Sequence, residues 1–374
     1  MNLEQAGWRP ELAAVFAAFA AEGLQPARVA LELNHIYRLW TAEGEVLAEA
    51  AGRLRHEAAG RHELPAVGDW VAFRPDPSTT LGASPLEADP IAPPRTKSRG
   101  RIEAILPRKS VFTRKVAGHE TRQQVVAANI DTVFLVTSLD RDFNPRRVER
   151  YLLLAAHSGA RPVVILNKSD LPDASTDDAI RAVAEIAPGV ATHAVSARTR
   201  AGLDALHPYL APGQTVALLG SSGVGKSSII NALVGEEVLK TRSVRERDSR
   251  GRHTSTHRQM VRLPGGALLI DTPGMRELQL WDVGDTFNQT FEDIDALAAG
   301  CRFRDCRHRQ EPGCAVKGAV AAGALPPDRY DSFLKLQAER DGFELRQDER
   351  SLIDEKRRSK IGAKALRARL KEKR

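Results

Sequence analysis

Hydrophobic and polar residues alternate over short runs between residues 27 and 116, and turn residues separate the runs. The clearest runs extend from Val29 to Leu33, from Val67 to Phe73 and from Ile102 to Phe112. Short strands without a helical period between them predict a small closed β-barrel, and an OB-like barrel is one such fold. Residues 75–100 interrupt the pattern with six prolines and few large apolar residues, which predicts a mobile insertion loop.

The first 26 residues are predicted to form a helical extension. The apolar run from Leu12 to Ala21 imitates the core of a signal peptide. However, Glu4, Glu11 and Glu22 flank it and it lacks a basic lead. We therefore predict an amphipathic surface helix in place of a targeting segment.

From residue 117 the apolar runs become nearly continuous, and helical segments separate them. Ile130–Val136, Arg161–Leu166 and Thr215–Leu219 have the composition of buried parallel strands. A helix is predicted over residues 146–157, because an Asn-Pro pair can cap its start and a glycine can end it. Alternating strands and helices predict a doubly wound α/β domain over residues 117–295, with ligands at the strand ends. A hairpin is predicted near its end, with Pro264-Gly265-Gly266 as the turn.

Length, cysteine content and hydropathy narrow the class of protein. A chain of 374 residues exceeds one ordinary hydrophobic core, so two or three domains are expected. No apolar run reaches the length of a membrane span, and three cysteines favour a reducing compartment over a disulfide framework. We therefore expect a cytoplasmic protein without a membrane partner. A monomer is also expected.

The net charge of +7 is concentrated at the C-terminus. Residues 355–374 contain ten lysines and arginines against two glutamates, so the remainder of the chain is nearly neutral. A basic tail over residues 346–374 suits an RNA or other polyanion surface, and a solvated tail that aids solubility is the alternative.

A phosphate-binding loop follows the strand predicted at 215–219. It matches the pattern G-x-x-x-x-G-K-[ST] and consists of Gly220, Ser221, Ser222, Gly223, Val224, Gly225, Lys226 and Ser227. The glycines let backbone N–H groups point at an anion, and the helix that continues from Ser228 adds the positive end of its dipole. We expect Lys226 to contact the β- and γ-phosphates and the Ser227 hydroxyl to bind Mg²⁺. These residues predict a nucleotide site.

A base-reading motif follows the strand predicted at 161–166. Its residues match the N-K-x-D pattern and are Asn167, Lys168, Ser169 and Asp170. The Asp170 carboxylate can accept two hydrogen bonds from guanine, whereas adenine offers no such pair of donors. Asn167 is expected to steady the loop and Lys168 to lie along the base. Two residues after the next strand are expected to complete the base pocket through backbone N–H groups, namely Ser196 and Ala197.

Asp271 and Gly274 end the second strand of the predicted hairpin and match a metal-side element. Asp271 is expected to reach Mg²⁺ through water, and the Gly274 amide to contact the γ-phosphate. A turn that merely ends a strand is the alternative. Met275 stands where many GTPases place a water-orienting glutamine, so fast unaided hydrolysis is not expected.

The polar segment 250–257 has the character of a switch that orders around a γ-phosphate. We expect Thr254, and Thr256 as the second choice, to bind Mg²⁺ when GTP is present. His253 could orient or activate the attacking water as a neutral imidazole. A phosphate contact or a merely exposed histidine is an equally open interpretation.

Every cysteine of the chain lies within fourteen residues, together with one histidine. The four residues are Cys301, Cys306, His308 and Cys314. Three thiolates and one imidazole fill a tetrahedron, so we expect a closed, structural Zn²⁺ site, with free thiols as the alternative. The arginines between them predict a basic face. The segment 296–345 is accordingly predicted to be an α-rich zinc-binding domain.

The order of these motifs is unusual, because the base-reading motif precedes the phosphate loop, the switch and Asp271. Together with Pro65–Val71, Gly251–Thr256 and the zinc signature, this order resembles the ribosome small-subunit-dependent, circularly permuted GTPase family. The resemblance covers about residues 27–340. It implies an N-terminal OB barrel, a permuted GTPase domain and a C-terminal zinc domain.

The resemblance also implies a function. Members of that family assist late maturation of the small ribosomal subunit, contact its rRNA, and hydrolyse GTP to GDP and phosphate with stimulation by the subunit. The histidine of the Gly-Arg-His motif, here His253, is implied to take part in hydrolysis. The proline-rich insertion and the basic tail depart from the family pattern, so the details of subunit contact stay open.

Two other classes of function compete with this interpretation. One is a GTP-gated signalling switch that acts on a protein partner through the barrel. The other is an RNA-binding protein with a vestigial nucleotide site, against which the intact Lys226, Ser227 and Asp170 argue. The basic tail and the arginines of the zinc segment favour RNA over a protein partner.

Overall fold

The fold is described from a computed structural model of the chain. The described residues are 2–33, 35–76, 100–115, 123–140, 143–235, 258–271, 287, 290–338 and 341. The chain divides into two compact units, one of residues 1–116 and 122–279 and the other of residues 117–121 and 280–374. Most of the proline-rich insertion, the switch segment and the basic tail lie outside the described residues. Among the described helices, none has the length and apolar character needed to cross a bilayer.

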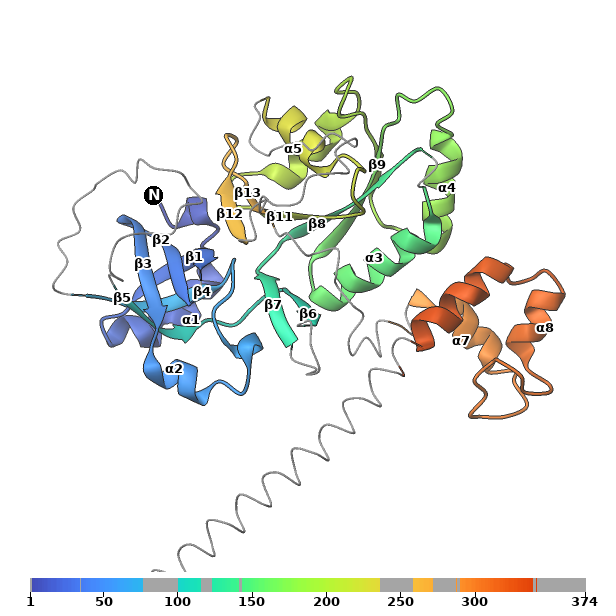
Figure 1. Cartoon of the computed structure of the whole chain (residues 1–374), viewed down its shortest axis with the longest axis horizontal. Coiled ribbons are helices and arrows are strands. Elements are labelled where there is room, and N and C mark those ends of the chain that lie inside the picture. The colour runs from blue at the N-terminus through green and yellow to red at the C-terminus, as the bar shows by residue number, and fades with distance from the viewer. Residues whose placement is uncertain are drawn as a thin grey trace, which may run out of the picture. The chain divides into compact units, whose positions relative to one another are not determined.

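A closed five-stranded barrel forms the first part of the first unit (Figure 1). Its strands are β1 (Gln25–Leu33), β2 (Ile36–Thr41), β3 (Gly44–Ala50), β4 (Trp70–Pro75) and β5 (Gly100–Ile105). The order β1-β2-β3-β5-β4 closes because β4 also pairs with β1. Inward-facing side chains such as Val29, Leu39 and Ile102 fill the interior. The predicted OB-like barrel is confirmed.

The run from Ile102 to Phe112 divides between two sheets, whereas the whole run was predicted to belong to the barrel. After β5, the Leu106 N–H donates to the Trp70 carbonyl at 2.8 Å. Pro107 follows and has no N–H with which to extend the ladder. The chain then forms β6 (Val111–Lys115), which pairs with β7 (Gln123–Ala128) in a two-stranded sheet of its own.

The N-terminal extension is helical, and aromatic rings attach it to the barrel. Its helices are η1 (Glu4–Ala6) and α1 (Pro10–Ala21), whereas α2 (Gly52–Glu57) and η2 (Arg61–Glu63) lie between β3 and β4 of the barrel. Phe16 is the buried side chain of α1, and its ring meets that of Trp8 edge-on at 5.8 Å between centroids. Trp8 in turn meets Trp70 of β4 at 4.7 Å. The other side chains of α1 are exposed or half-buried, which confirms a surface helix.

The second part of the first unit is an α/β domain. Its strands are β8 (Thr132–Ser138), β9 (Arg161–Asn167), β10 (Thr192–Ala194), β11 (Thr215–Leu219), β12 (Gln259–Arg262) and β13 (Leu268–Asp271). They are ordered β10-β9-β8-β11-β13-β12, and only the β12–β13 hairpin is antiparallel. The helices between them are α3 (Pro145–Ser158), α4 (Thr176–Ile186), η3 (Leu203–Leu210) and α5 (Lys226–Val234). Figure 1 shows α3 and α5 on opposite faces of the sheet, so the predicted α/β layering and hairpin are confirmed.

Helix α3 begins and ends as its sequence predicts. The Asn144 Oδ1 accepts from the N–H groups of Arg146 at 2.9 Å and Arg147 at 3.3 Å, and Pro145 occupies the first turn. Gly159 ends the helix with a φ of 80°, in the left-handed region. The helix is therefore one residue longer at each end than predicted.

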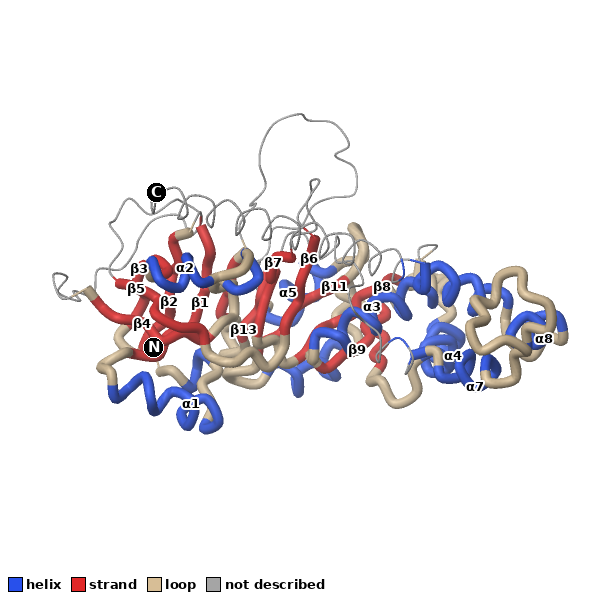
Figure 2. Tube along the Cα trace, turned by 90° about the horizontal axis from the view of Figure 1, so that it is seen from below, coloured by secondary structure: helices blue, strands red, loops and turns tan. Residues whose placement is uncertain are grey.

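Strand β1 joins the barrel to the α/β sheet, because it pairs with β12 at Leu31 and Gln259. Eleven strands consequently form one continuous hydrogen-bonded sheet. Figure 2 shows the strands of the barrel and of the α/β domain following one another.

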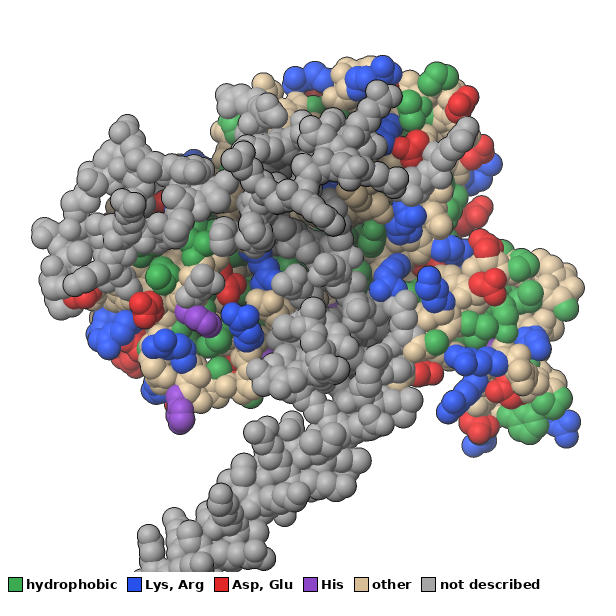
Figure 3. All heavy atoms as spheres, viewed as in Figure 1, with side chains coloured by type: hydrophobic (Ala, Val, Ile, Leu, Met, Phe, Trp, Pro, Cys, Tyr) green, Lys and Arg blue, Asp and Glu red, His purple; other side chains and the backbone are tan. Residues whose placement is uncertain are grey.

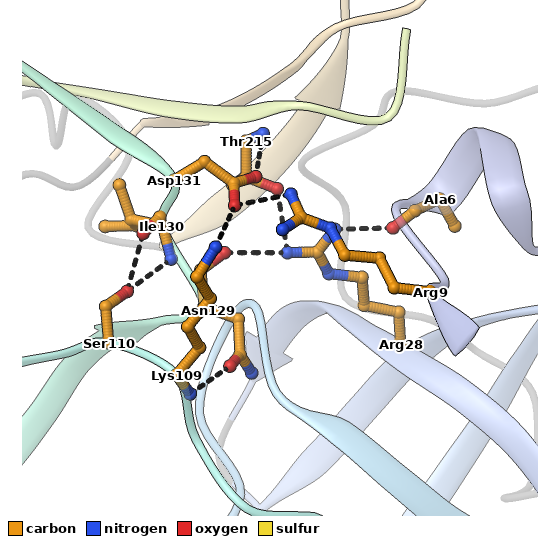
Figure 4. A network of polar contacts seen from close by, with 9 residues as sticks. All are labelled: Ala6, Arg9, Arg28, Lys109, Ser110, Asn129, Ile130, Asp131 and Thr215. Atoms are coloured by element: carbon orange, nitrogen blue, oxygen red, sulfur yellow. Dashed lines mark hydrogen bonds and ion pairs between the residues drawn. The ribbon is translucent and has the colours of Figure 1, made fainter. Parts of the chain in front are cut away.

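A buried arginine of β1 reinforces this junction (Figure 4). Arg28 donates from Nη1 to the Ala6 carbonyl at 2.5 Å, and from Nη2 to the Asn129 carbonyl at 3.1 Å and the Thr215 hydroxyl at 2.8 Å. Burial lowers the pKa of Arg28 to about 10, so the guanidinium remains charged at neutral pH. Its hydrogen bonds connect the N-terminal extension, the barrel and the α/β domain.

Asp131 provides the opposite charge in this network (Figure 4). Its carboxylate accepts from Arg9 Nη2 at 2.6 Å, from Lys109 Nζ at 3.3 Å and from the Thr215 N–H at 2.9 Å. Thr215 begins β11, the strand that leads into the phosphate loop. The network therefore fixes the N-terminal end of β11.

The second unit is described by itself and contains α7 (Glu292–Ala298), α8 (Ala315–Ala321) and a helical run over residues 327–338. Three rings form its core, with centroids 4.9–5.5 Å apart, namely Phe287, Phe291 and Phe333. Arg329 donates to both carboxylate oxygens of Asp293 at 2.7 and 2.9 Å. The described part of this unit is helical without strands, as the sequence predicts.

Candidate nucleotide site and metal centre

The predicted nucleotide-binding residues lie at the carboxyl ends of three parallel strands. The phosphate loop follows β11, the base-reading residues follow β9, and Ser196 and Ala197 follow β10. Parallel strands end at the same edge of a sheet, so motifs distant in sequence meet there. The structure places all three motifs at that edge.

Asn167 ties the three motifs together. Its Nδ2 donates to the Val224 carbonyl of the phosphate loop at 2.8 Å, and its Oδ1 accepts from the Ala197 N–H at 3.1 Å. Gly225 is needed beside it, since its φ is 95° and a Cβ there would lie 2.2 Å from Asn167 Nδ2. The buried amide thus couples the phosphate loop to both base-side segments.

Lys226 begins α5 and lies along the phosphate loop. Its Nζ donates to the carbonyls of Gly220 at 2.8 Å and Ser221 at 2.6 Å. Gly223 and Gly225 have positive φ values of 82° and 95°, which turn the backbone ahead of the helix. The first N–H groups of α5 have no acceptor within the helix, so this arrangement can hold an anion.

Two side chains of α3 contact the phosphate loop without having been predicted. Arg147 Nη1 donates to Ser221 Oγ at 3.0 Å, and the Tyr151 hydroxyl lies 3.4 Å from the same oxygen. Their four-residue spacing places both on one face of α3. That spacing occurs on every helix, so the sequence offered no signal for this contact.

Lys168 is anchored by an acidic residue that the sequence also did not single out. Its Nζ donates to Asp140 Oδ2 at 2.6 Å, and Asp140 Oδ1 accepts from Ser138 Oγ at 2.9 Å. Asp140 lies just beyond β8, the strand beside β9. Its place at a strand end was the available signal, since side chains at these ends converge.

Asp170 is held by a hydroxyl and a guanidinium. Its Oδ1 accepts from Ser196 Oγ at 2.5 Å, and its Oδ2 accepts from Arg198 Nε at 2.7 Å. These hydrogen bonds, that from Ser196 first, hold the pKa of Asp170 below its ordinary value. The group is therefore ionised at neutral pH and can only accept hydrogen bonds.

The N–H groups expected to complete the base pocket have acceptors within the protein. The Ser196 N–H donates to the Ala201 carbonyl at 2.9 Å, and the Ala197 N–H donates to Asn167. In this geometry Ser196 contributes to the base side through its hydroxyl on Asp170. A role of the two N–H groups toward a base stays a prediction.

Asp271 ends β13, which lies parallel to β11 and beside it. Its position therefore corresponds to the edge that carries the phosphate loop. His253, Thr254, Thr256 and Gly274 lie outside the described residues. Their expected roles toward water, Mg²⁺ and the γ-phosphate stay predictions.

The three cysteines and His308 form a compact cluster, with all ligand atoms within 4.8 Å of one another. His308 Nδ1 lies 3.6 Å from Cys301 Sγ and 3.4 Å from Cys314 Sγ, and these two sulfurs are 3.9 Å apart. A tetrahedron with Zn–S bonds of about 2.3 Å and a Zn–N bond of about 2.0 Å has edges of about 3.5–3.8 Å. The cluster is therefore compatible with Zn²⁺.

Backbone groups support the sulfur ligands. The Ala315 N–H donates to Cys301 Sγ at 3.3 Å, and Cys314 caps the start of α8. Although burial raises it, the pKa of Cys301 is lowered overall by the N–H groups of Val316 and Ala315. This favours the thiolate, which is the form that binds a metal ion.

The loop of the metal cluster presents a basic surface. Its exposed arginines are Arg302, Arg304, Arg307 and Arg309. Glu311 accepts from its own N–H and from backbone N–H groups of this loop, which lowers its pKa to about 2. The Glu311 carboxylate thus stabilises the loop by accepting hydrogen bonds from its backbone. Figure 3 shows lysine and arginine side chains on this unit, interspersed with acidic and hydrophobic ones.

Comparison with known proteins places this site in a family context. A family described as RsgA GTPase matches residues 105–281. The small ribosomal subunit biogenesis GTPase RsgA of Opitutus terrae is 50% identical over 342 residues, covering 91% of this chain and 90% of that protein. The small ribosomal subunit biogenesis GTPase RsgA 2 of Lactiplantibacillus plantarum is 49% identical over 304 residues, with 81% and 80% covered.

Two crystal structures share the fold. YjeQ from Thermotoga maritima matches with a TM-score of 0.57 and 26% identity, over 84% of this chain and 97% of that chain. YloQ, described as a circularly permuted GTPase, matches with a TM-score of 0.54 and 23% identity, over 86% and 96%.

Proposed function

The chain belongs to the RsgA GTPase family and is a GTP hydrolase, and on that premise we propose that it assists late maturation of the small ribosomal subunit. The observation that carries this proposal is the 50% identity to an RsgA over 91% of this chain and 90% of that protein. A match of that length leaves too few residues to omit the barrel, the α/β domain or the metal cluster.

The proposed reaction is hydrolysis of GTP to GDP and phosphate at the edge of the sheet. The phosphate loop holds the phosphates, with Lys226 contacting the β- and γ-phosphates. Asp170 accepts from guanine N1–H and the 2-amino group, supported by the hydrogen bond from Ser196. Arg147 and Tyr151 hold Ser221 and thereby position the loop.

Mg²⁺ fits the proposed site through the chemistry of its donors. The Ser227 hydroxyl and Thr254 would bind the ion, and Asp271 would contact it through water. Held there, Mg²⁺ would supply positive charge to the phosphate oxygens. His253 is proposed to orient the attacking water, and Gly274 to donate its N–H to the γ-phosphate.

Zn²⁺ is the metal proposed for the cluster of Cys301, Cys306, His308 and Cys314. Four protein ligands leave no position for a substrate, so its role is structural. The exposed arginines of the same loop and the basic tail are proposed to contact rRNA. We propose further that the protein acts as a cytoplasmic monomer.

Subunit dependence is the test of this function. Met275 stands in place of a water-orienting glutamine, so intrinsic turnover should be slow. Adding purified small ribosomal subunits should raise GTP turnover severalfold or more, whereas large subunits should not. Lys226→Ala serves as the inactive control, because it removes the phosphate-contacting ammonium.

Two outcomes would favour other functions. Turnover unchanged by small subunits but raised by a protein partner would support a GTP-gated signalling switch. Binding to subunits without any GTP turnover would support an RNA-binding protein with a vestigial nucleotide site.

A further inference from the structure

Arg198 contacts the same carboxylate that is proposed to bind guanine. Its Nε donates to Asp170 Oδ2 at 2.7 Å, and its Nη2 forms an ion pair with that oxygen. The Arg198 side chain is 75% exposed, whereas that of Asp170 is 12% exposed. The arginine can therefore leave the carboxylate for water without disturbing a packed core.

The segment after β10 holds Arg198 beside Asp170. The Ser196 N–H donates to the Ala201 carbonyl at 2.9 Å, and the Thr199 N–H donates to Ser196 Oγ at 3.0 Å. Ser196 Oγ in turn donates to Asp170 Oδ1 at 2.5 Å. This short closed loop keeps the guanidinium at a high local concentration near the carboxylate.

The number of acceptor positions on Asp170 creates a conflict with guanine. An ionised carboxylate offers about four acceptor positions, two on each oxygen. Ser196 donates to Oδ1, Arg198 donates from Nε to Oδ2 and holds its Nη2 against the same oxygen, and the N–H of Asp170 also donates to its own carboxylate. Guanine presents two parallel donors, N1–H and the 2-amino group, which need one position on each oxygen. Oδ2 therefore cannot accept from guanine until Arg198 releases it.

Hypoxanthine distinguishes this conflict from a general charge effect. Its base has the N1–H donor of guanine but no 2-amino group. A single donor needs only one oxygen, and Oδ1 is the oxygen that Arg198 does not contact. Arg198 should consequently oppose guanine nucleotides more than hypoxanthine nucleotides.

We propose that Arg198 is a specificity-determining residue that competes with the 2-amino group of guanine for Oδ2 of Asp170. The inference rests on the proposed function, in which Asp170 binds guanine. Competition lowers affinity for GDP and GTP, and it accelerates their release because Arg198 returns to the carboxylate as the base leaves. It adds a residue outside the N-K-x-D motif to the control of base binding.

The test compares binding of GDP and inosine diphosphate to the full-length protein by titration calorimetry. Exposed ion pairs contribute little, so Arg198→Ala should tighten GDP binding by about two- to five-fold. Binding of inosine diphosphate should change by much less. Stopped-flow displacement should show slower GDP release from Arg198→Ala by a similar factor.

Arg200→Asn is the matched control. Arg200 lies in the same loop, and its φ of 65° is a conformation that asparagine tolerates. This variant removes the same charge without touching Asp170 and should change neither titration. Arg198→Gln, which keeps a long polar side chain, should reproduce the gain in GDP affinity and guards against misfolding of the alanine variant.

Three results would overturn the inference: weaker GDP binding by both Arg198 variants, unchanged GDP binding, or an equal gain for inosine diphosphate. An equal gain would show a general effect of charge. A wild-type protein that binds no guanine nucleotide would instead contradict the proposed function. The two failures are therefore distinguishable.

Discussion

Asp170 can select among bases because its carboxylate is ionised and offers acceptors alone. The hydroxyl of Ser196 orients one oxygen and lowers the pKa of the group. A base that lacks paired N–H donors cannot form these charge-assisted hydrogen bonds with the carboxylate, so it binds more weakly than guanine.

Replacing this carboxylate should change base preference. Asp170→Asn should weaken GTP binding by about 100-fold, because charge-assisted hydrogen bonds contribute about 1.5–3 kcal/mol each. It should improve binding of xanthosine triphosphate, whose C2 oxygen can accept from the new amide. Competition titrations with both nucleotides measure the change. A variant with full preference for GTP would contradict the base-binding role.

His253 should affect the chemical step more than binding. His253→Ala should leave GTP affinity within about two-fold and lower subunit-stimulated turnover by about 100-fold, the usual scale of general base catalysis. Single-turnover assays with small subunits measure the effect. His257→Ala, in the same segment, is the control. An unaltered stimulated rate would return His253 to an exposed histidine without a catalytic role.

The sequence predicted the residues whose chemistry depends on spacing along the chain. Lys226 and Asp170 belong to such patterns, because a phosphate loop and a base-reading turn are built from consecutive residues. Arg147 and Arg198 were not predicted as contacts of these motifs. Their positions depend on how α3 and the loop after β10 pack, which no local pattern in the sequence encodes.

At the scale of elements, the second unit has a small hydrophobic core, and the cluster of Cys301, Cys306, His308 and Cys314 is expected to add to its stability. Within its described part the unit has two helices of seven residues, a helical run over residues 327–338 and one cluster of three phenylalanine rings. Short helices are marginal by themselves, so their stability depends on tertiary ties. A metal ion held by four side chains would provide such a tie.

Removing one ligand should therefore unfold this unit selectively. Cys306→Ser should abolish stoichiometric zinc, measured by atomic absorption, and make residues 290–338 sensitive to protease. GDP binding should persist, because the nucleotide site lies in the other unit. Gln310→Ser, an exposed position in the same loop, should retain zinc. Full zinc content in Cys306→Ser would remove that residue from the ligand set.

Helices and strands were predicted well where capping or turn residues mark their ends. They were predicted poorly where the chain passes from one sheet to another. The helix α3 and the hairpin β12–β13 have caps and turn residues that fix their limits. Phe112 was placed with the barrel because its run is apolar. The structure places Phe112 in β6, where it pairs with Ala127 of β7. This pairing between distant segments cannot be predicted from the local apolar pattern.

At the scale of the whole molecule, charge is distributed very unevenly. The segment from Lys356 to Arg374 contains ten basic residues and one acidic residue, although the full chain has a net charge of only +7. Without that segment the protein is slightly acidic. The attraction to polyanions should therefore be a property of the tail and the arginine-rich metal loop.

Deleting Lys356–Arg374 should weaken binding to small subunits at low salt. It should also make the dependence of affinity on salt shallower. On duplexes, the slope of log affinity against log salt concentration decreases in magnitude by about 0.9 for every phosphate that the tail no longer neutralises. Titrations at three salt concentrations measure both effects. Intrinsic GTP turnover should not change. Identical slopes would indicate a solvated tail, and the attraction to rRNA would then fall to the barrel and the metal loop.

The burial of Arg28 determines how this protein can be divided into working parts. Its partner Ala6 precedes the barrel in the sequence, and its partners Asn129 and Thr215 follow it. A barrel produced alone would expose the Arg28 guanidinium to solvent. An α/β domain produced alone would lack Arg9 and Arg28, the positive charges near Asp131. Chimaeras between relatives should accordingly exchange residues up to 279 as a single piece. A boundary between β5 and β8 would cut through the arginine's hydrogen bonds and yield two unstable fragments.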